Sequence, residues 1–164
     1  MDFENSSFTK SALNFQENTS VAKPMEKYVY KTSFIVPFSD IDMLGHVNNA
    51  KYLTYFETAR TEHFFESGRK KIDVGKMGII MARAEIDYKY PAKWHDELTL
   101  KMKTSSVGNS SWTYEYEIVN EKENKVVALG KSVQVTFDYT AQKSVPIPKE
   151  AREALLKEVE ACKE

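Results

Sequence analysis

One helical segment stands between a single strand-like run and four consecutive strand-like runs, and this order restricts the folds open to the chain. Apolar residues recur in the segment with a 3.6-residue period, which predicts an amphipathic helix ending near Gly68. The apolar arc is broad and consists of Tyr52, Leu53, Tyr55, Phe56, Ala59, His63 and Phe64. A helix with so wide an arc has to be wrapped by other structure rather than rest on a surface.

Runs rich in β-branched and aromatic residues predict strands at 27–38, 79–90, 97–106, 111–120 and 125–138. Three of them contain alternating apolar rows, namely Leu98, Leu100 and Met102; Trp112, Tyr114, Tyr116 and Ile118; and Val133, Val135 and Phe137. Residues 148–164, which start at a proline, predict a surface helix. We therefore predict an α+β fold, in which a curled antiparallel sheet of about five strands surrounds a central helix and a C-terminal helix follows. The edge strands of such a sheet favour self-association.

Length and charge exclude several classes of protein. The chain has 164 residues and a formal net charge of -1, so it predicts one domain with no field that favours nucleic acid or an anionic membrane. The single cysteine, Cys162, excludes an internal disulfide and fits a reducing compartment. Residues 1–26 are polar and lack an apolar run, which predicts a disordered leader before one domain at 27–164, in a cytoplasmic protein without a membrane span.

The segment between Phe38 and Arg60 carries most of the chemical signal. Asp40 and Asp42 lie two residues apart, Gly45 permits backbone angles that other residues resist, and Asn48 or Asn49 is placed to cap the following helix. A helix start gathers unpaired amides that stabilise a developing oxyanion, so a carboxylate beside it suits acyl chemistry. The same pattern also fits a capped helix behind an ordinary acidic turn.

Arg60 falls inside the apolar arc of the helix. A guanidinium is costly to bury alone, and Glu57, three residues earlier, is the nearest candidate partner. We expect a structural ion pair or a snorkelling Arg60 rather than direct catalysis by either residue, so that loss of Glu57 mainly lowers stability.

The segment SDIDMLGHVNNAKYLTYFETAR, followed at the expected distance by AEIDYKYPAKWHDELTL, resembles the hotdog-fold thioesterases of the 4-hydroxybenzoyl-CoA thioesterase type. The resemblance covers residues from about 27 to 138. It implies hydrolysis of an acyl- or aroyl-CoA to the free acid and CoA. Coenzyme A is then part of the substrate, and no separate cofactor is expected.

The resemblance also implies roles for individual residues. Asp42 corresponds to the acid that acts as nucleophile on the thioester carbonyl or as base for water. The backbone N–H of Asn49 polarises the carbonyl, Gly45 shapes the approach, and His46 orients neighbours or contacts substrate. A related branch of the fold uses a glutamate on the central helix, which makes Glu57 the rival carboxylate.

The resemblance also implies a homodimer or a dimer of dimers, with active sites at the interface and the pantetheine arm of CoA between protomers. The residues that correspond to their nucleotide-binding loop are Gly108, Asn109, Ser110 and Ser111. That loop lacks the arginines of some relatives, so phosphate binding falls to backbone amides and hydroxyls or to Arg83, Lys89 and Lys93, unless the carrier is an acyl carrier other than CoA. Aromatic residues such as Tyr52, Tyr55 and Trp112 suit either an aryl group or a fatty chain.

Other functions compete with hydrolysis. Asp42 with His46 mimics the acid and histidine pair of hotdog enoyl-thioester hydratases, and a non-catalytic acyl-thioester binding protein is a third reading. A metal site would need His46, His63 and His95, but no HExxH or clustered Cys/His spacing occurs, so we predict no metal. Nucleic-acid binding is not expected either, because no basic stripe accompanies the aromatic residues.

Overall fold

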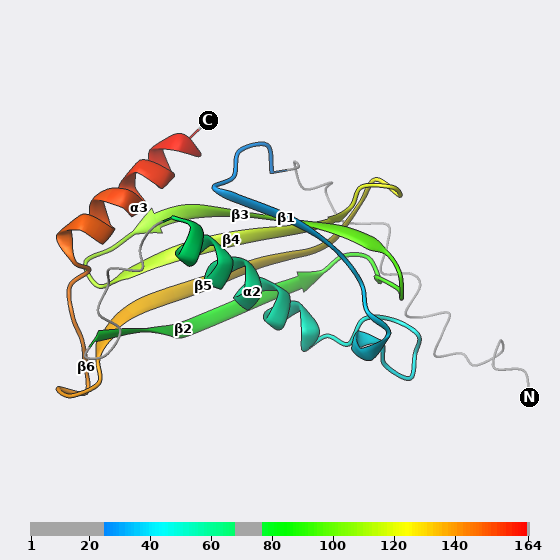
Figure 1. Ribbon diagram of the computed structural model, residues 1–164, viewed down its shortest axis with the longest axis horizontal. Helices are drawn as coiled ribbons and strands as arrows, with labels where there is room; N and C mark the ends of the chain where they lie inside the picture. Colours follow the sequence, from blue (N-terminus) through cyan, green and yellow to red (C-terminus); the bar gives the residue numbers. More distant parts are fainter. Residues whose placement is uncertain (1–24, 68–76, 164) are drawn as a thin grey trace, which may run out of the picture.

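The computed structural model describes residues 25–67 and 77–163 (Figure 1). The elements are β1 (Tyr30–Ile35), the 3-10 helix η2 (Phe38–Asp40), α2 (Lys51–Glu66), β2 (Met77–Tyr88), β3 (Glu97–Val107), β4 (Ser111–Asn120), β5 (Lys125–Asp138), β6 (Lys143–Ser144) and α3 (Lys149–Ala161). Nearly all of the predicted leader at 1–26, and the predicted helix end at Gly68, lie outside the described residues.

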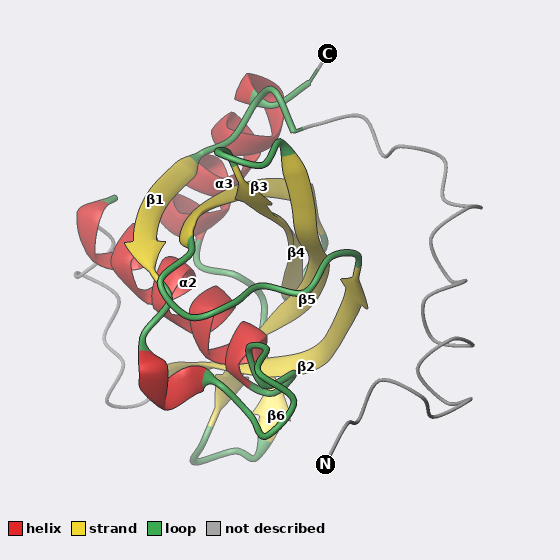
Figure 2. Cartoon of the chain, turned by 90° about the vertical axis from the view of Figure 1, so that its right-hand side faces the viewer, coloured by secondary structure: helices red, strands yellow, loops and turns green. Residues whose placement is uncertain are grey.

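The strands form one antiparallel sheet in the order β1-β3-β4-β5-β2, and the short β6 pairs with β5. The sheet curls around α2, which lies in its concave side (Figures 1 and 2). This arrangement confirms the predicted α+β class, the strand order along the chain and the helix surrounded by other structure. It leaves β1 and β2 as the edge strands of the five-strand path.

Helix α2 is held in the sheet by Phe56, whose ring stacks on that of Tyr116 with centroids 4.3 Å apart. Gly130 of β5 leaves the room for this ring, because a Cβ atom there would come within 2.3 Å of the Phe56 ring. Phe56 is 2% exposed, and burying such a side chain contributes about 1.5 to 3 kcal/mol. The bare backbone at Gly130 therefore fixes how closely α2 approaches the sheet.

The face of the sheet that meets α2 is called here the inner face. The predicted rows of β3 and β4 lie on it and are buried: Leu98, Leu100 and Met102, and Trp112, Tyr114, Tyr116 and Ile118. The alternating apolar row predicted in β5 exists, but it lies on the opposite, outer face of the sheet. Register with β4 places Ser132 and Gln134 on the inner face, while Val133 and Val135 point outward and are only partly buried.

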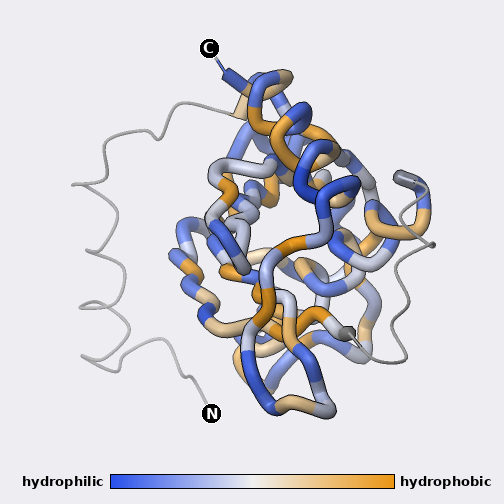
Figure 3. The backbone as a smooth tube through the Cα atoms, turned by 90° about the vertical axis from the view of Figure 1, so that its left-hand side faces the viewer, coloured by the Kyte–Doolittle hydropathy of each residue, from blue (hydrophilic) through white to orange (hydrophobic). Residues whose placement is uncertain are grey.

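Helix α3 packs against β3, beyond the part of that strand with which β1 pairs (Figure 1). Hydrophilic and hydrophobic residues alternate along it, as in an amphipathic helix (Figure 3). Leu155 is buried, and Glu158 contacts His63 Nε2 at 2.9 Å and accepts a hydrogen bond from Thr104 at 2.5 Å. The predicted surface helix is thus anchored on one side to both α2 and β3.

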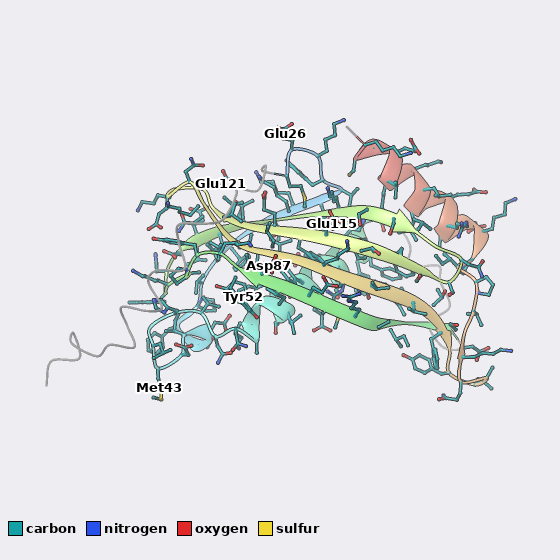
Figure 4. All side chains as sticks on the ribbon, turned by 180° about the vertical axis from the view of Figure 1, so that it is seen from behind. Glu26, Met43, Tyr52, Asp87, Glu115 and Glu121 are labelled. Atoms are coloured by element: carbon teal, nitrogen blue, oxygen red, sulfur yellow. The ribbon has the colours of Figure 1, made fainter. Side chains whose placement is uncertain are left out.

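The outer face of the sheet carries alternating charges. Glu115 on β4 lies 3.3 Å from Lys103 on β3 and 3.5 Å from Lys131 on β5 (Figure 4). Burial pushes the pKa of Glu115 upward, but the two lysines outweigh it and hold the pKa below its ordinary value.

A cavity of about 620 Å³ lies over these strands. Within the described residues, no helix is long and apolar enough to cross a membrane.

Candidate active site

A tight turn between η2 and α2 holds Asp42. The Asp42 N–H donates to the carbonyl of His46 at 2.9 Å, and the Gly45 N–H donates to the carbonyl of Asp42 at 3.0 Å. Gly45 has φ +79°, a conformation that side chains with a Cβ resist. The predicted need for glycine at this point therefore has a specific cause in the turn.

The carboxylate of Asp42 is only half engaged. One oxygen, Oδ1, accepts a hydrogen bond from the Leu44 N–H at 2.8 Å. The other oxygen has no hydrogen-bond or ion-pair partner among residues 25–67 and 77–163, and the side chain is partly exposed. The turn thus orients the group and leaves an oxygen for a substrate or a water molecule.

Asp40, two residues earlier, is fully engaged. It is 8% exposed, pairs with Lys51 Nζ at 2.9 Å and accepts a hydrogen bond from the Tyr55 hydroxyl at 2.7 Å. Burial by itself would raise the pKa of Asp40, but the bonds from Lys51 and Tyr55 outweigh burial and lower it. Burial and the same bond raise the pKa of Tyr55. Asp40 therefore ties the turn to the first two turns of α2.

The start of α2 presents a free amide. Asn48 Oδ1 accepts the Ala50 N–H at 3.0 Å, so Asn48, and not Asn49, is the side chain that satisfies an amide at the helix start. The residue before α2 is Ala50, which gives no side-chain cap. In the described part of the chain the N–H of Asn49 has no acceptor, and it lies where the helix dipole favours negative charge.

Tyr88 on the edge strand β2 fixes the backbone at this point. Its hydroxyl donates to the carbonyl of Asn49 at 3.0 Å, and its ring packs edge-on against that of Tyr52 with centroids 5.2 Å apart. No local pattern predicts this contact, because 39 residues separate the two partners. Tyr52 is 3% exposed, so it supports the Tyr88 ring from within the core. Burial is the main cause that raises the pKa of the Tyr52 hydroxyl.

The segment around Ala92 closes the other side of the turn. Ala92 is buried, and its carbonyl accepts the Val47 N–H at 2.9 Å. His46 is partly buried, but no hydrogen bond joins its ring to Asp42 among the described residues. Those residues also contain no group of three or more His, Cys, Asp or Glu side chains arranged to hold a metal ion.

The expected ion pair between Glu57 and Arg60 is wrong. Glu57 is exposed on α2, whereas Arg60 turns toward the sheet and donates to the Tyr116 hydroxyl at 3.3 Å. Three residues of an α-helix do not bring two side chains together when one faces solvent and the other faces a sheet. Glu57 also lies in the second turn of α2, well after Asp42 in the sequence, and no contact joins the two residues in the described part of the chain.

The loop at 108–111 does not lie near Asp42 in the same chain. Its strand, β3, begins beside the turn, where the Val36 N–H donates to the carbonyl of Asp96 at 2.9 Å. The loop follows the other end of β3, and a strand of 11 residues spans about 35 Å. One chain therefore separates the two parts of the expected site. Gly108, Asn109, Ser110 and Ser111 form a closed turn in which the Gly108 N–H donates to the carbonyl of Ser111 at 2.7 Å.

An arginine does stand beside this loop, although sequence reasoning missed it. Arg152 of α3 donates to the carbonyl of Gly108, 44 residues away in the chain. By contrast, Arg83 lies on edge strand β2 and pairs with Glu85 at 2.5 Å. Lys89 follows the end of β2 that is near the start of α2, and it pairs with Asp87 at 3.7 Å. In the register of the sheet, Arg83 pairs with Val133 of β5, which pairs with Thr113 of β4, so a phosphate-binding role for Arg83 or Lys89 stays a prediction.

Comparison with known proteins identifies the fold and the family. Residues 36–155 match the profile of the thioesterase-like superfamily. The chain belongs to this superfamily. The match includes the turn at Asp42, helix α2 and strands β2 to β5, and it begins just after β1, so the resemblance seen in the sequence is confirmed.

Individual relatives agree with this assignment. The chain is 32% identical over 133 residues to the uncharacterised protein YsmA of Bacillus subtilis, covering 77% of this chain and 89% of that one. It is 29% identical over 116 residues to the long-chain acyl-CoA thioesterase FadM of Escherichia coli, covering 70% and 88%. A solved thioesterase of Thermus thermophilus, complexed with coenzyme A and Zn, superposes with a TM-score of 0.71 and 30% identity, covering 83% and 98%. The predicted hotdog fold is confirmed by these likenesses.

Proposed function

We propose that this protein hydrolyses the thioester of an acyl-CoA, with Asp42 as the reacting carboxylate and the N–H of Asn49 as oxyanion donor. The observation that carries the proposal is the half-engaged carboxylate of Asp42, held by the Leu44 N–H in a turn that leads directly to a helix start with a free amide. Membership of the thioesterase-like superfamily and the similarity to FadM, a long-chain acyl-CoA thioesterase, support the choice of a thioester.

Two routes give the same products. In one, an oxygen of Asp42 attacks the carbonyl carbon, the C–S bond breaks, the CoA thiolate takes up a proton, and water then hydrolyses the mixed anhydride. In the other, Asp42 takes a proton from water as the water oxygen attacks, and the proton passes to the departing sulfur. Either route develops negative charge on the carbonyl oxygen, which a helix-start amide stabilises.

The test is release of free thiol from a panel of acyl-CoA and acyl-carrier substrates, from short aliphatic to aromatic. We expect Asp42→Asn to lower kcat by at least about a hundredfold without unfolding the protein. Loss of enoyl absorbance without thiol would indicate a hydratase. Binding without turnover, indifferent to Asp42→Ala, would indicate a non-catalytic binding protein.

We further propose that two copies complete each site, as a homodimer or a dimer of dimers. Support comes from the distance between the turn at Asp42 and the loop at Gly108 within one chain, and from the open edge of β2. A partner's loop, with Arg152 beside it, would then receive the nucleotide phosphates while the pantetheine arm passes between protomers. A cytoplasmic location belongs to the same proposal.

Complementation tests the shared site. Asp42→Asn and Arg152→Glu each disable a different part, so a mixture of the two variants after subunit exchange should recover kcat/KM at low substrate, because some mixed dimers contain one intact site. Light scattering that shows only monomer at micromolar concentration, or no recovery in mixtures shown to contain mixed dimers, would contradict the shared site.

A further inference from the structure

Two polar side chains occupy inner positions of β5 where an apolar core would normally lie. Ser132 is 2% exposed and Gln134 is 4% exposed, while the valines between and beside them point outward. Thr136, the next inner residue, is explained by the fold, because its hydroxyl donates to backbone carbonyls of Ser110 or Val145. Ser132 and Gln134 bond instead to other side chains inside the sheet.

Arg60 joins this group from α2. Its guanidinium donates to the Tyr116 hydroxyl at 3.3 Å, and that hydroxyl lies 2.7 Å from Ser132 Oγ, which also accepts from Gln134 Nε2 at 2.9 Å. No carboxylate pairs with Arg60 anywhere in the described residues. A partly buried cation without a counter-ion is costly, so an anion from outside the chain would relieve a real penalty.

The cluster has more donors than acceptors. Whichever of Tyr116 and Ser132 donates to the other, the hydroxyl hydrogen of the second residue has no acceptor among the hydrogen bonds of the described residues. Trp112, which pairs with Gln134 in the β4–β5 register, adds an enclosed indole N–H with no acceptor in the described structure. An unsatisfied buried donor costs about 1 to 3 kcal/mol, so a ligand with acceptor oxygens fits here.

The cluster lies at a defined distance from the proposed oxyanion donor. Arg60 follows Asn49 by eleven residues, which is about 16 Å along a helix. On the sheet, Tyr88 bonds to Asn49 and pairs with Ala128, and Ser132 lies four residues farther along β5, or about 13 Å. The distance along α2 and the distance along β5 are similar, and α2 lies along the concave side of the sheet (Figure 2).

An apolar strip connects the two points. By register with the inner residues of β5, the inner residues of edge strand β2 are Ile79, Met81, Ala84, Ile86 and Tyr88. Met81 is 45% exposed and Tyr88 is 50% exposed, so this strip is not fully covered within one chain. A methylene chain that starts at the helix entrance could lie along it toward Arg60.

Resting on the proposed function, we propose that the preferred acyl group is an ω-carboxyacyl chain of medium length, whose distal carboxylate binds Arg60 and the adjoining donors of Ser132 and Trp112. The methylene chain lies on the inner strip of β2. A guanidinium with neighbouring hydroxyl and indole donors matches a carboxylate in both charge and hydrogen bonding.

The experiment compares kcat/KM by thiol release for three acyl-CoA substrates of equal chain length that end in a methyl, a hydroxyl or a carboxylate. We expect the carboxylate to be preferred over the methyl by at least about tenfold, with the hydroxyl between them. Arg60→Met should abolish this preference, while Lys157→Met, which removes an exposed cation on α3, should retain it.

Trp112→Phe is a second test of the same site, which remains usable if the Arg60 variant does not fold. It removes only the unsatisfied N–H and part of a ring, so a purely structural tryptophan would change the melting temperature and leave the carboxylate-to-methyl ratio constant. We expect that ratio to fall. The inference is overturned if the wild-type enzyme prefers the methyl or the hydroxyl chain. It is also overturned if neither variant changes the carboxylate-to-methyl ratio of kcat/KM. Absence of thiol from every substrate overturns the proposed function itself.

Discussion

Asp40 and Asp42 offer a matched pair of isosteric substitutions with opposite expected effects. Asp40→Asn keeps the size of the side chain and an acceptor for the Tyr55 hydroxyl, but it removes the charge that pairs with Lys51 at 2.9 Å. Hydrogen bonds to a charged group contribute about 1.5 to 3 kcal/mol and neutral ones about 1 kcal/mol. Because the Lys51 side chain is 40% exposed, its ion pair adds no more than about 1 kcal/mol.

The expected loss is therefore about 1.5 kcal/mol in the free energy of unfolding, or a melting temperature lower by about 5 °C in a chain of this size. Asp42→Asn should change the free energy of unfolding by no more than about 0.5 kcal/mol, because its carboxylate has one hydrogen bond from a backbone amide and is partly exposed. Turnover should show the reverse order, with the larger loss at position 42.

Acidity provides a second measurement on the same pair. The pKa of Asp40 is lowered in the folded state, so its contribution is complete above the unfolded pKa of about 4 and disappears as the pH falls through the folded value. In urea titrations, the difference in the free energy of unfolding between wild type and Asp40→Asn should be roughly constant from pH 6 to 8. It should shrink below about pH 4. A gap that is independent of pH, or an Asp42→Asn protein that is the less stable of the two, would refute the assignment of structural and reacting roles.

Three further predictions follow from single contacts. Tyr88→Phe keeps the ring against Tyr52 but frees the carbonyl of Asn49, so kcat should fall about tenfold at nearly constant melting temperature; steady-state kinetics that show only a change in KM would count against it. Gly130→Ala brings a methyl group to 2.3 Å from the Phe56 ring and should lower stability by about 1 to 3 kcal/mol in chemical denaturation, whereas an equally stable variant would mean that the ring moves freely. Glu57→Ala should leave stability within about 0.5 kcal/mol of wild type, because Glu57 is exposed and does not pair with Arg60; a large drop would restore the ion pair that the structure removes.

Local features of the candidate site were predictable because neighbours in sequence build them. Gly45 turns the chain, Asn48 caps the amide of Ala50, and Asp42 accepts from Leu44, all between residues 42 and 50. The strand order and the buried rows of β3 and β4 were also predictable, since alternation and period directly reflect which side of an element is apolar. The face on which the apolar row of β5 lies was not predictable, because alternation shows that a strand has two different faces but does not say which one meets the helix.

The sequence by itself determined the order of elements, the turn at Asp42 and the family, because each depends on residues close together in the chain. Only the tertiary structure decided that Tyr88 holds the backbone of Asn49, that Arg152 stands beside Gly108, and that Arg60 turns from Glu57 to Tyr116. These partners are 39, 44 and 56 residues apart. Their meeting depends on how the sheet curls and on where α2 crosses it, which is set by packing at Phe56 and Gly130 and is not encoded in any local pattern.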